Sequence, residues 1–133
     1  MKQAFASVAW VAAMTALVWL AAAPRAGAIS QFKKEFEAKY VKPDSTDAKQ
    51  KAFAEAVEKA KCNVCHAGTT KRERNAYGQA LDRLLDKQAD RDAPERIRAA
   101  LEKVAAMKSK PDDPKAPTFG EIIASGKLPG GAE

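Results

Sequence analysis

The chain has 133 residues, of which 46% are apolar and 30% are charged, and its formal net charge is +6. Two cysteines can form one disulfide at most, which excludes a disulfide-rich scaffold, and no segment after residue 28 is continuously apolar, which excludes a membrane protein with several spans. Residues 29–133 offer room for one small domain.

Residues 29–133 carry 21 basic and 17 acidic side chains, a net charge of +4. The two signs are interleaved along the chain, and the aromatic residues fall on apolar faces of the expected helices. A nucleic-acid-binding domain concentrates lysine and arginine on one face, so we do not expect nucleic acid as a partner. The basic excess instead favours solubility and attraction to an acidic partner protein.

The first 28 residues have the features of a secretory signal. Lys2 supplies the positive start, residues 5–23 form the apolar stretch, and Ala26-Gly27-Ala28 is a small-x-small cleavage site. We therefore expect cleavage after Ala28 and a periplasmic domain over residues 29–133, with no stable membrane span. The alternative is an uncleaved anchor, because the 19 residues from Phe5 to Ala23 nearly cross a hydrocarbon core of ~30 Å when helical.

Helical periodicity dominates residues 29–133, and no alternating strand pattern is present. Pro43 ends a first helix over about residues 30–41, whose aromatic face is Phe32, Phe36 and Tyr40. Thr46 or Asp47 is the expected cap of a second helix, whose narrow apolar stripe runs into Cys62: Phe53, Ala54, Val57 and Ala60.

Three further helices follow. Asn75 is the expected N-cap of the third, which turns Tyr77, Leu81, Leu84 and Leu85 inward. Asp92 and Glu95 resemble a capping box at the start of the fourth, with Pro94 in its first turn. The inward face of the fourth is Ile97, Ala100, Leu101, Val104 and either Met107 or Lys108. A second capping box, Thr118 and Glu121, opens a short last helix that Gly126 closes.

The expected fold class is therefore all-α, a bundle of four to five short helices. Only 22 apolar residues other than alanine, none of them tryptophan, are available to fill its core. This is a thin core for 105 residues, so we expect another group to complete it.

The chemistry is concentrated in Cys62-Asn63-Val64-Cys65-His66, the C-x-x-C-H sequence of c-type haem attachment. Two intervening residues let one turn of chain present both thiols to the vinyl edges of a porphyrin. Covalent thioethers from Cys62 and Cys65 then hold the ring, and His66 becomes the proximal axial ligand of the iron. One haem c would also complete the core, packed against Phe32, Phe36, Tyr40, Leu81, Leu84, Leu101 and Ile122.

Three other interpretations of the cysteines fit less well. A thioredoxin-like redox pair belongs to a βαβ arrangement, and no strand pattern is present. A structural zinc site needs four ligands, and no Cys or His remains elsewhere in the chain to supply them. A disulfide across a two-residue loop constrains the unfolded chain very little.

The sequence leaves several candidates for the distal ligand of the iron. A single histidine excludes ligation by two histidines within one subunit. Met107, 41 residues after His66, is one candidate, and methionine ligation favours a raised potential and electron transfer. The competing interpretation is that Met107 only fills the core. An open site, a lysine, a tyrosine hydroxyl or a ligand from a partner chain are the other candidates.

Three residues beyond the motif are candidates for contact with the haem. Arg74 suits a propionate, because a guanidinium pairs with a carboxylate through two hydrogen bonds, although a basic run is often only a solvated face. Tyr77 is a candidate for packing on the haem, the alternative being ordinary core packing with its hydroxyl at the edge. Gly78 permits close approach of the third helix to the ring or to a neighbouring helix.

Residues 62–85, CNVCHAGTTKRERNAYGQALDRLL, resemble a group of small exported monohaem cytochromes c of planctomycetes, including anammox bacteria. The shared features are the C-x-x-C-H motif, the basic run after it and an Asn-x-Tyr-Gly-x-x-Leu helix start. Residues 118–123 and 126–129 are similar to the end of these proteins. Together the similar segments cover about a third of residues 29–133.

The resemblance implies a periplasmic cytochrome c-like bundle around one covalent haem. Some members of this group form heterodimers and bind nitric oxide at a haem whose distal ligand is a cysteine. The present chain departs from them, because both of its cysteines belong to the attachment motif. It also lacks the Met-Pro loop of common class I cytochromes c, so neither cysteine nor methionine ligation follows from the resemblance.

The expected function is one-electron transfer by a periplasmic cytochrome c that docks on an acidic redox partner. The alternative is a haem-based binder or sensor of a diatomic gas, nitric oxide or carbon monoxide, acting as part of a homo- or heterodimer. We do not expect an enzyme, since a peroxidase-like reaction needs a distal acid or base and no second histidine exists.

Overall fold

The computed structural model describes residues 27–131, with side chains from residue 31 onward. Its regular elements are five α-helices and one 3-10 helix: α1 (Gly27–Tyr40), α2 (Ala48–Ala60), η1 (Lys61–Val64), α3 (Ala76–Asp82), α4 (Pro94–Ala105) and α5 (Phe119–Ala124). Within the described residues the only β-type pairings are two isolated bridges. The prediction of an all-α fold is confirmed.

The described helices include none that is both long and apolar enough to cross a membrane. The expected export signal, residues 1–28, lies outside the described residues except for its last two positions.

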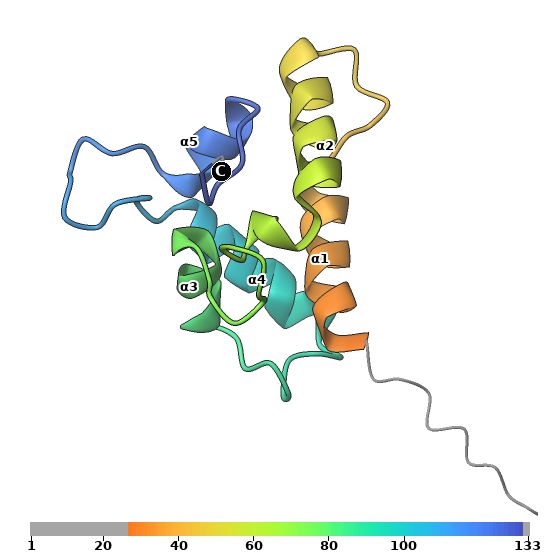
Figure 1. Ribbon diagram of the computed structural model, residues 1–133, viewed down its shortest axis with the longest axis vertical. Coiled ribbons are helices and arrows are strands. Elements are labelled where there is room, and N and C mark those ends of the chain that lie inside the picture. Colours follow the sequence, from red (N-terminus) through yellow and green to blue (C-terminus); the bar gives the residue numbers. More distant parts are fainter. Residues whose placement is uncertain (1–26, 132–133) are drawn as a thin grey trace, which may run out of the picture.

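Helix α4 occupies the centre of the fold. It contacts α1, α3 and α5, and in Figure 1 it runs between α1 on one side and α3 on the other. Its apolar face is buried as the helical period predicts, each side chain being at most 4% exposed: Ile97, Ala100, Leu101 and Val104. Tyr40 ties α1 to this helix, because its hydroxyl donates a hydrogen bond of 3.1 Å to the carbonyl oxygen of Leu101.

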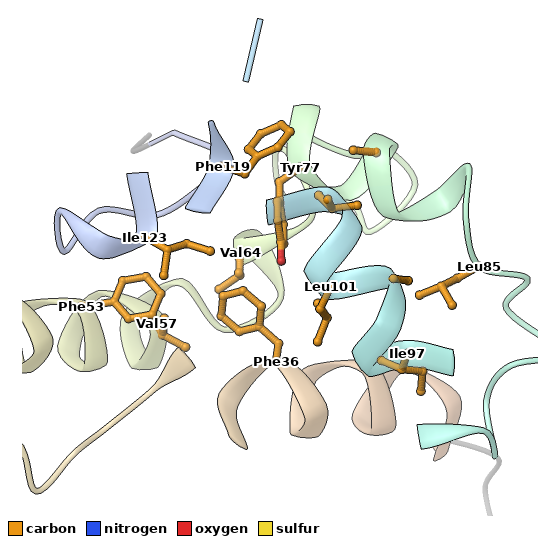
Figure 2. Packing of buried hydrophobic residues seen from close by; sticks show 13 residues of the cluster. Phe36, Phe53, Val57, Val64, Tyr77, Leu85, Ile97, Leu101, Phe119 and Ile123 are labelled. Carbon is orange, nitrogen blue, oxygen red and sulfur yellow. The ribbon is translucent and has the colours of Figure 1, made fainter. Parts of the chain in front are cut away.

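Three aromatic rings from three helices connect the two ends of the core (Figure 2). Tyr77 of α3 packs edge-on against Phe36 of α1, with 5.8 Å between ring centroids, and against Phe119 of α5, with 5.3 Å. Edge-to-face packing brings the positive edge of one ring to the negative face of another. The short helices α3 and α5 are therefore held to α1 by side chains that are far apart in the sequence.

Three of the expected helix caps are confirmed. Asp47 accepts a hydrogen bond from the Lys49 amide at the start of α2, and Asn75 accepts one from the Gly78 amide at the start of α3. Thr118 and Glu121 form the expected reciprocal capping box of α5. Gly126, with φ of +83°, follows the end of α5, where a glycine adopts the left-handed conformation without steric cost.

The expected cap of the fourth helix is wrong. Helix α4 starts at Pro94, its N-cap is Ala93, and no side chain caps it. Asp92 instead pairs with Arg91 at 2.9 Å on the surface. The preceding loop is organised by Asp90, whose buried carboxylate accepts a hydrogen bond from the Asp86 amide and pairs with Arg96. These contacts order the chain before α4, whose start receives no hydrogen bond from Asp92.

Two helices are shorter than their apolar pattern suggests. Helix α3 ends at Asp82, so Leu84 and Leu85 lie in the turn after it, although Leu85 is still buried. Helix α4 ends at Ala105, where the chain turns and the Met107 carbonyl oxygen accepts a hydrogen bond from the Phe119 amide. Met107 is 40% exposed as a result, so its expected place on the inward face of this helix is wrong.

We expect Thr118→Ala to lower the free energy of unfolding by about 1 kcal/mol, because the substitution removes the side-chain acceptor at the start of α5. Denaturant titration of the purified protein measures this loss. Asp92→Ala is the matched control and should change stability by less than about 0.5 kcal/mol, since Asp92 caps no helix. An equal loss in the two variants would contradict the observed start of α4.

Candidate functional site

A cavity of about 190 Å³ lies beside the C-x-x-C-H sequence. Its walls come from α1, α2, η1, the loop between η1 and α3, α3, the turn after α3, and α4. Most of the lining is apolar, and the apolar side chains are Phe32, Phe36, Val57, Val64, Leu81, Leu85, Ile97 and Leu101. Of the residues expected to surround a haem, Phe32, Phe36, Leu81 and Leu101 line this cavity, whereas Tyr40, Leu84 and Ile122 do not.

Cys62, Cys65 and His66 all line the same cavity. A tight turn brings them together, because the amides of Cys65 and His66 both donate hydrogen bonds to the Cys62 carbonyl oxygen, at 3.2 and 3.0 Å. Both cysteines are free thiols. Burial, and to a smaller extent the neighbouring Cys62, raises the pKa of the Cys65 thiol to about 12, so this thiol is protonated at neutral pH.

The imidazole of His66 is oriented by a backbone group. Its Nδ1 lies 3.2 Å from the carbonyl oxygen of Glu73, which also accepts a hydrogen bond from the Ala67 amide. A carbonyl oxygen only accepts, so this contact is a hydrogen bond when Nδ1 carries the proton. Nε2 is then the unprotonated nitrogen and is the one available to a metal.

Asn75 holds the turn of residues 62–66 against the start of α3. Its Nδ2 donates hydrogen bonds of 3.1 Å to the carbonyl oxygens of Asn63 and Val64, while its Oδ1 caps α3 through the Gly78 amide. A Cβ atom on Gly130 would overlap the Asn75 amide group, so the C-terminal segment lies directly on this side chain. One side chain thus joins three segments of the chain.

A close approach is observed at Gly78, but its partner is the carbonyl oxygen of Cys65 in the attachment turn, whereas a haem ring or a neighbouring helix was expected. A Cβ atom at position 78 would overlap this oxygen. Gly78 also lines the cavity. The absence of a side chain at Gly78 therefore lets α3 pack directly on the attachment turn.

The remaining site candidates lie in three different environments. Arg74 lines the cavity and pairs with Asp82 at 2.9 Å, so a propionate would compete with an existing partner. Met107 is 40% exposed and is not one of the described residues that line the cavity. Tyr77 packs in the core behind the cavity wall and is not a lining residue.

The core packing that was the alternative for Tyr77 is confirmed, but the expected position of its hydroxyl at the edge is wrong, because the hydroxyl is buried. Tyr77 is 0% exposed, and within the described residues its hydroxyl has no hydrogen-bond partner. Figure 2 shows this oxygen directed toward the region between Val64 and Leu101, two residues of the cavity wall. Burial raises the pKa of Tyr77 far above its usual value, so the hydroxyl is neutral at physiological pH.

Two contacts of the site could not be predicted from the sequence: the one between His66 and the Glu73 carbonyl, and those between the Asn75 amide and the attachment turn. Their acceptors are backbone carbonyls, which every residue carries. The residue type of Asn75 indicated only a helix cap.

In residues 27–131 no group of three or more His, Cys, Asp or Glu side chains is arranged to hold a bare metal ion. Comparisons of the chain with known protein families, with curated proteins and with solved structures find no significant match. The similarity of residues 62–85 to anammox cytochromes therefore stays a prediction.

We expect Gly78→Ala to destabilise the protein by at least about 2 kcal/mol, because the added methyl group overlaps a backbone oxygen that cannot rotate away. Thermal unfolding measures the effect. Ala76→Gln, at an exposed position of the same helix, should shift stability by less than about 0.5 kcal/mol. A Gly78→Ala protein with native stability would show that α3 does not pack on Cys65.

Proposed function

We propose that this chain is a periplasmic c-type cytochrome that binds one haem covalently and carries single electrons. One observation carries the proposal: the two thiols and the imidazole of the C-x-x-C-H sequence line one apolar cavity, with Nδ1 of the histidine engaged by a backbone carbonyl. In this proposal Cys62 and Cys65 form the thioethers, and His66 ligates the iron through Nε2.

The residues around the cavity fit a haem. The apolar side chains of α1 and α4 suit the faces of a macrocycle, which would complete the core. Cationic side chains at the same cavity suit the carboxylates of a haem periphery. When bound, the haem supplies the one-electron couple of its iron, while the protein supplies attachment, ligation and an environment of low polarity.

An enzymatic function is not proposed. Among the described lining residues the one carboxylate is Asp82, which pairs with Arg74. The one imidazole is that of His66, which the proposal assigns to the iron.

The first test is covalent attachment in cells that express a cytochrome c maturation system. The native chain should retain haem after denaturation and acid-acetone extraction, and Cys62→Ser/Cys65→Ser should lose it, because no thioether can form. His66→Ala should alter the absorption spectrum of any attached haem through loss of its axial ligand. Ser109→Ala, remote from the motif, is the control for expression. A native chain that carries no covalent haem would contradict the proposal.

The position of Met107 favours a second candidate function, binding of a diatomic gas. Apart from the C-x-x-C-H residues, the described lining offers no methionine or histidine as a ligand for iron. Its other donor groups are the amines of four lysines and the carboxylate of Asp82, which pairs with Arg74. A haem without a methionine or a second histidine has a distal position that is open or easily displaced. The proposed unit for this function is a homo- or heterodimer, the heterodimer being what the resemblance implies.

Two spectra separate these functions. We expect Met107→Ala to leave the spectra of both oxidation states unaltered, because Met107 does not line the cavity. Carbon monoxide added to the reduced protein should shift the Soret band if gas binding is the function. A low-spin reduced spectrum untouched by carbon monoxide would contradict gas binding, and a changed spectrum in Met107→Ala would contradict the described position of Met107.

A further inference from the structure

The chain reverses its direction directly after α5. The Gly126 amide donates a hydrogen bond of 2.9 Å to the carbonyl oxygen of Ile123. The Lys127 amide donates one of 3.2 Å to that of Ile122, which completes the Schellman arrangement at a helix end. Gly126 has φ of +83°, and a Cβ atom there would lie 2.8 Å from the carbonyl oxygen of Lys49. The reversal therefore requires a glycine and is packed against the start of α2.

Residues 128–131, which we call the C-terminal clasp, form the next turn. The Gly131 amide donates a hydrogen bond of 3.2 Å to the Leu128 carbonyl oxygen, and Pro129 occupies the second position, which proline favours. Leu128 packs against the hydrophobic core, and Pro129 is buried. Figure 1 shows this end of the chain beside α5. The C-terminal clasp is therefore a packed part of the fold.

The two glycines of the C-terminal clasp are required for different reasons. Gly131 has φ of +89°, which favours glycine, and a Cβ atom there would meet no other atom within 4 Å. The φ of Gly130 is not positive, but a Cβ atom there would overlap the side-chain amide of Asn75. Glycine at position 130 is therefore required by the close approach of one side chain and not by its own backbone conformation.

The Asn75 side chain cannot move aside without losing its hydrogen bonds. Its Nδ2 donates hydrogen bonds of 3.1 Å to the carbonyl oxygens of Asn63 and Val64, and it lies 3.5 Å from that of His66. Its Oδ1 is engaged by the start of α3. A larger residue at position 130 would displace the amide group from these carbonyls. The C-terminal clasp thus holds in place the side chain that binds the backbone of the attachment turn.

We propose that Gly130 and the C-terminal clasp position the axial histidine. By holding the Asn75 amide, they would fix the backbone of residues 63–66 and so the direction of the His66 imidazole. The inference rests on the proposed function, because it takes His66 as the iron ligand. The orientation of a ligating imidazole affects how strongly it donates to the metal. A closed clasp would strengthen this donation, which favours oxidised iron and lowers the reduction potential.

The test compares the haem-loaded native protein with Gly130→Ala, whose methyl group displaces the Asn75 amide. Hydrogen exchange of the Cys65 and His66 amides, which bind the Cys62 carbonyl oxygen, measures opening of the turn. We expect these two amides to exchange about tenfold faster relative to the amides of α4, which report global unfolding. Voltammetry should show a higher reduction potential in the same variant.

Gly131→Ala is the matched control. It adds the same methyl group at the adjacent position, where no other atom lies within 4 Å. Its positive φ costs stability of the whole fold, so comparison with α4 is needed here too. Relative exchange of the turn amides and the reduction potential should both stay at their native values.

A double-mutant cycle tests the route through Asn75. Asn75→Asp keeps an oxygen that caps α3 but removes the amide donor to the attachment turn. This variant should show the same faster exchange as Gly130→Ala. The two substitutions together should have no larger effect than either alone, because both remove one contact.

The outcomes separate this inference from the function on which it rests. Equal increases in exchange at the turn and in α4 would assign the C-terminal clasp to global stability and overturn it. A looser turn with a native reduction potential would overturn it, and so would additive effects of Gly130→Ala and Asn75→Asp. Failure of the proposed function is seen earlier and separately, as a native chain without covalent haem.

Discussion

The side chain of Asn75 is the interaction on which the candidate site depends. Through its amide nitrogen it holds the carbonyls of Asn63 and Val64, and through its oxygen it starts α3. The turn with Cys62, Cys65 and His66 is therefore held to the same helix that packs on Cys65 at Gly78. The hydrogen bonds of Asn75 are partly shielded from water and satisfy backbone groups that a turn leaves unpaired. They therefore stabilise the conformation of the turn.

The packing of α1 and α4 provides the opposite wall of the cavity. Phe36 and Leu101 are buried in the common core and at the same time line the cavity. Core and site therefore share side chains, and a group that fills the cavity would add its apolar surface to the same core. This sharing gives a physical account of how the proposed prosthetic group would enlarge the core of a chain with few bulky apolar residues.

The sequence predicted a helix start correctly where one capping side chain is sufficient to form it. Asp47, Asn75 and Thr118 each accept a hydrogen bond from an amide two or three residues later, and such a contact depends on little else. Asp92 has the same local pattern, but the buried Asp90 and its partners set the direction of the chain there. Met107 continues the apolar period of α4, but this helix ends at Ala105. The carbonyl oxygen of Met107 accepts a hydrogen bond from the Phe119 amide, which is not part of α4.

The helical class, most of the caps and the spacing of two thiols and an imidazole follow from the amino-acid sequence, because these features depend on residues within one or two turns of each other. Tertiary packing places an apolar cavity beside the three groups, brings the Glu73 carbonyl oxygen to Nδ1 of His66, and leaves Met107 outside the cavity lining. These features arise where segments distant in sequence pack together. The partner of a backbone carbonyl cannot be predicted from the sequence, because every residue carries the same group.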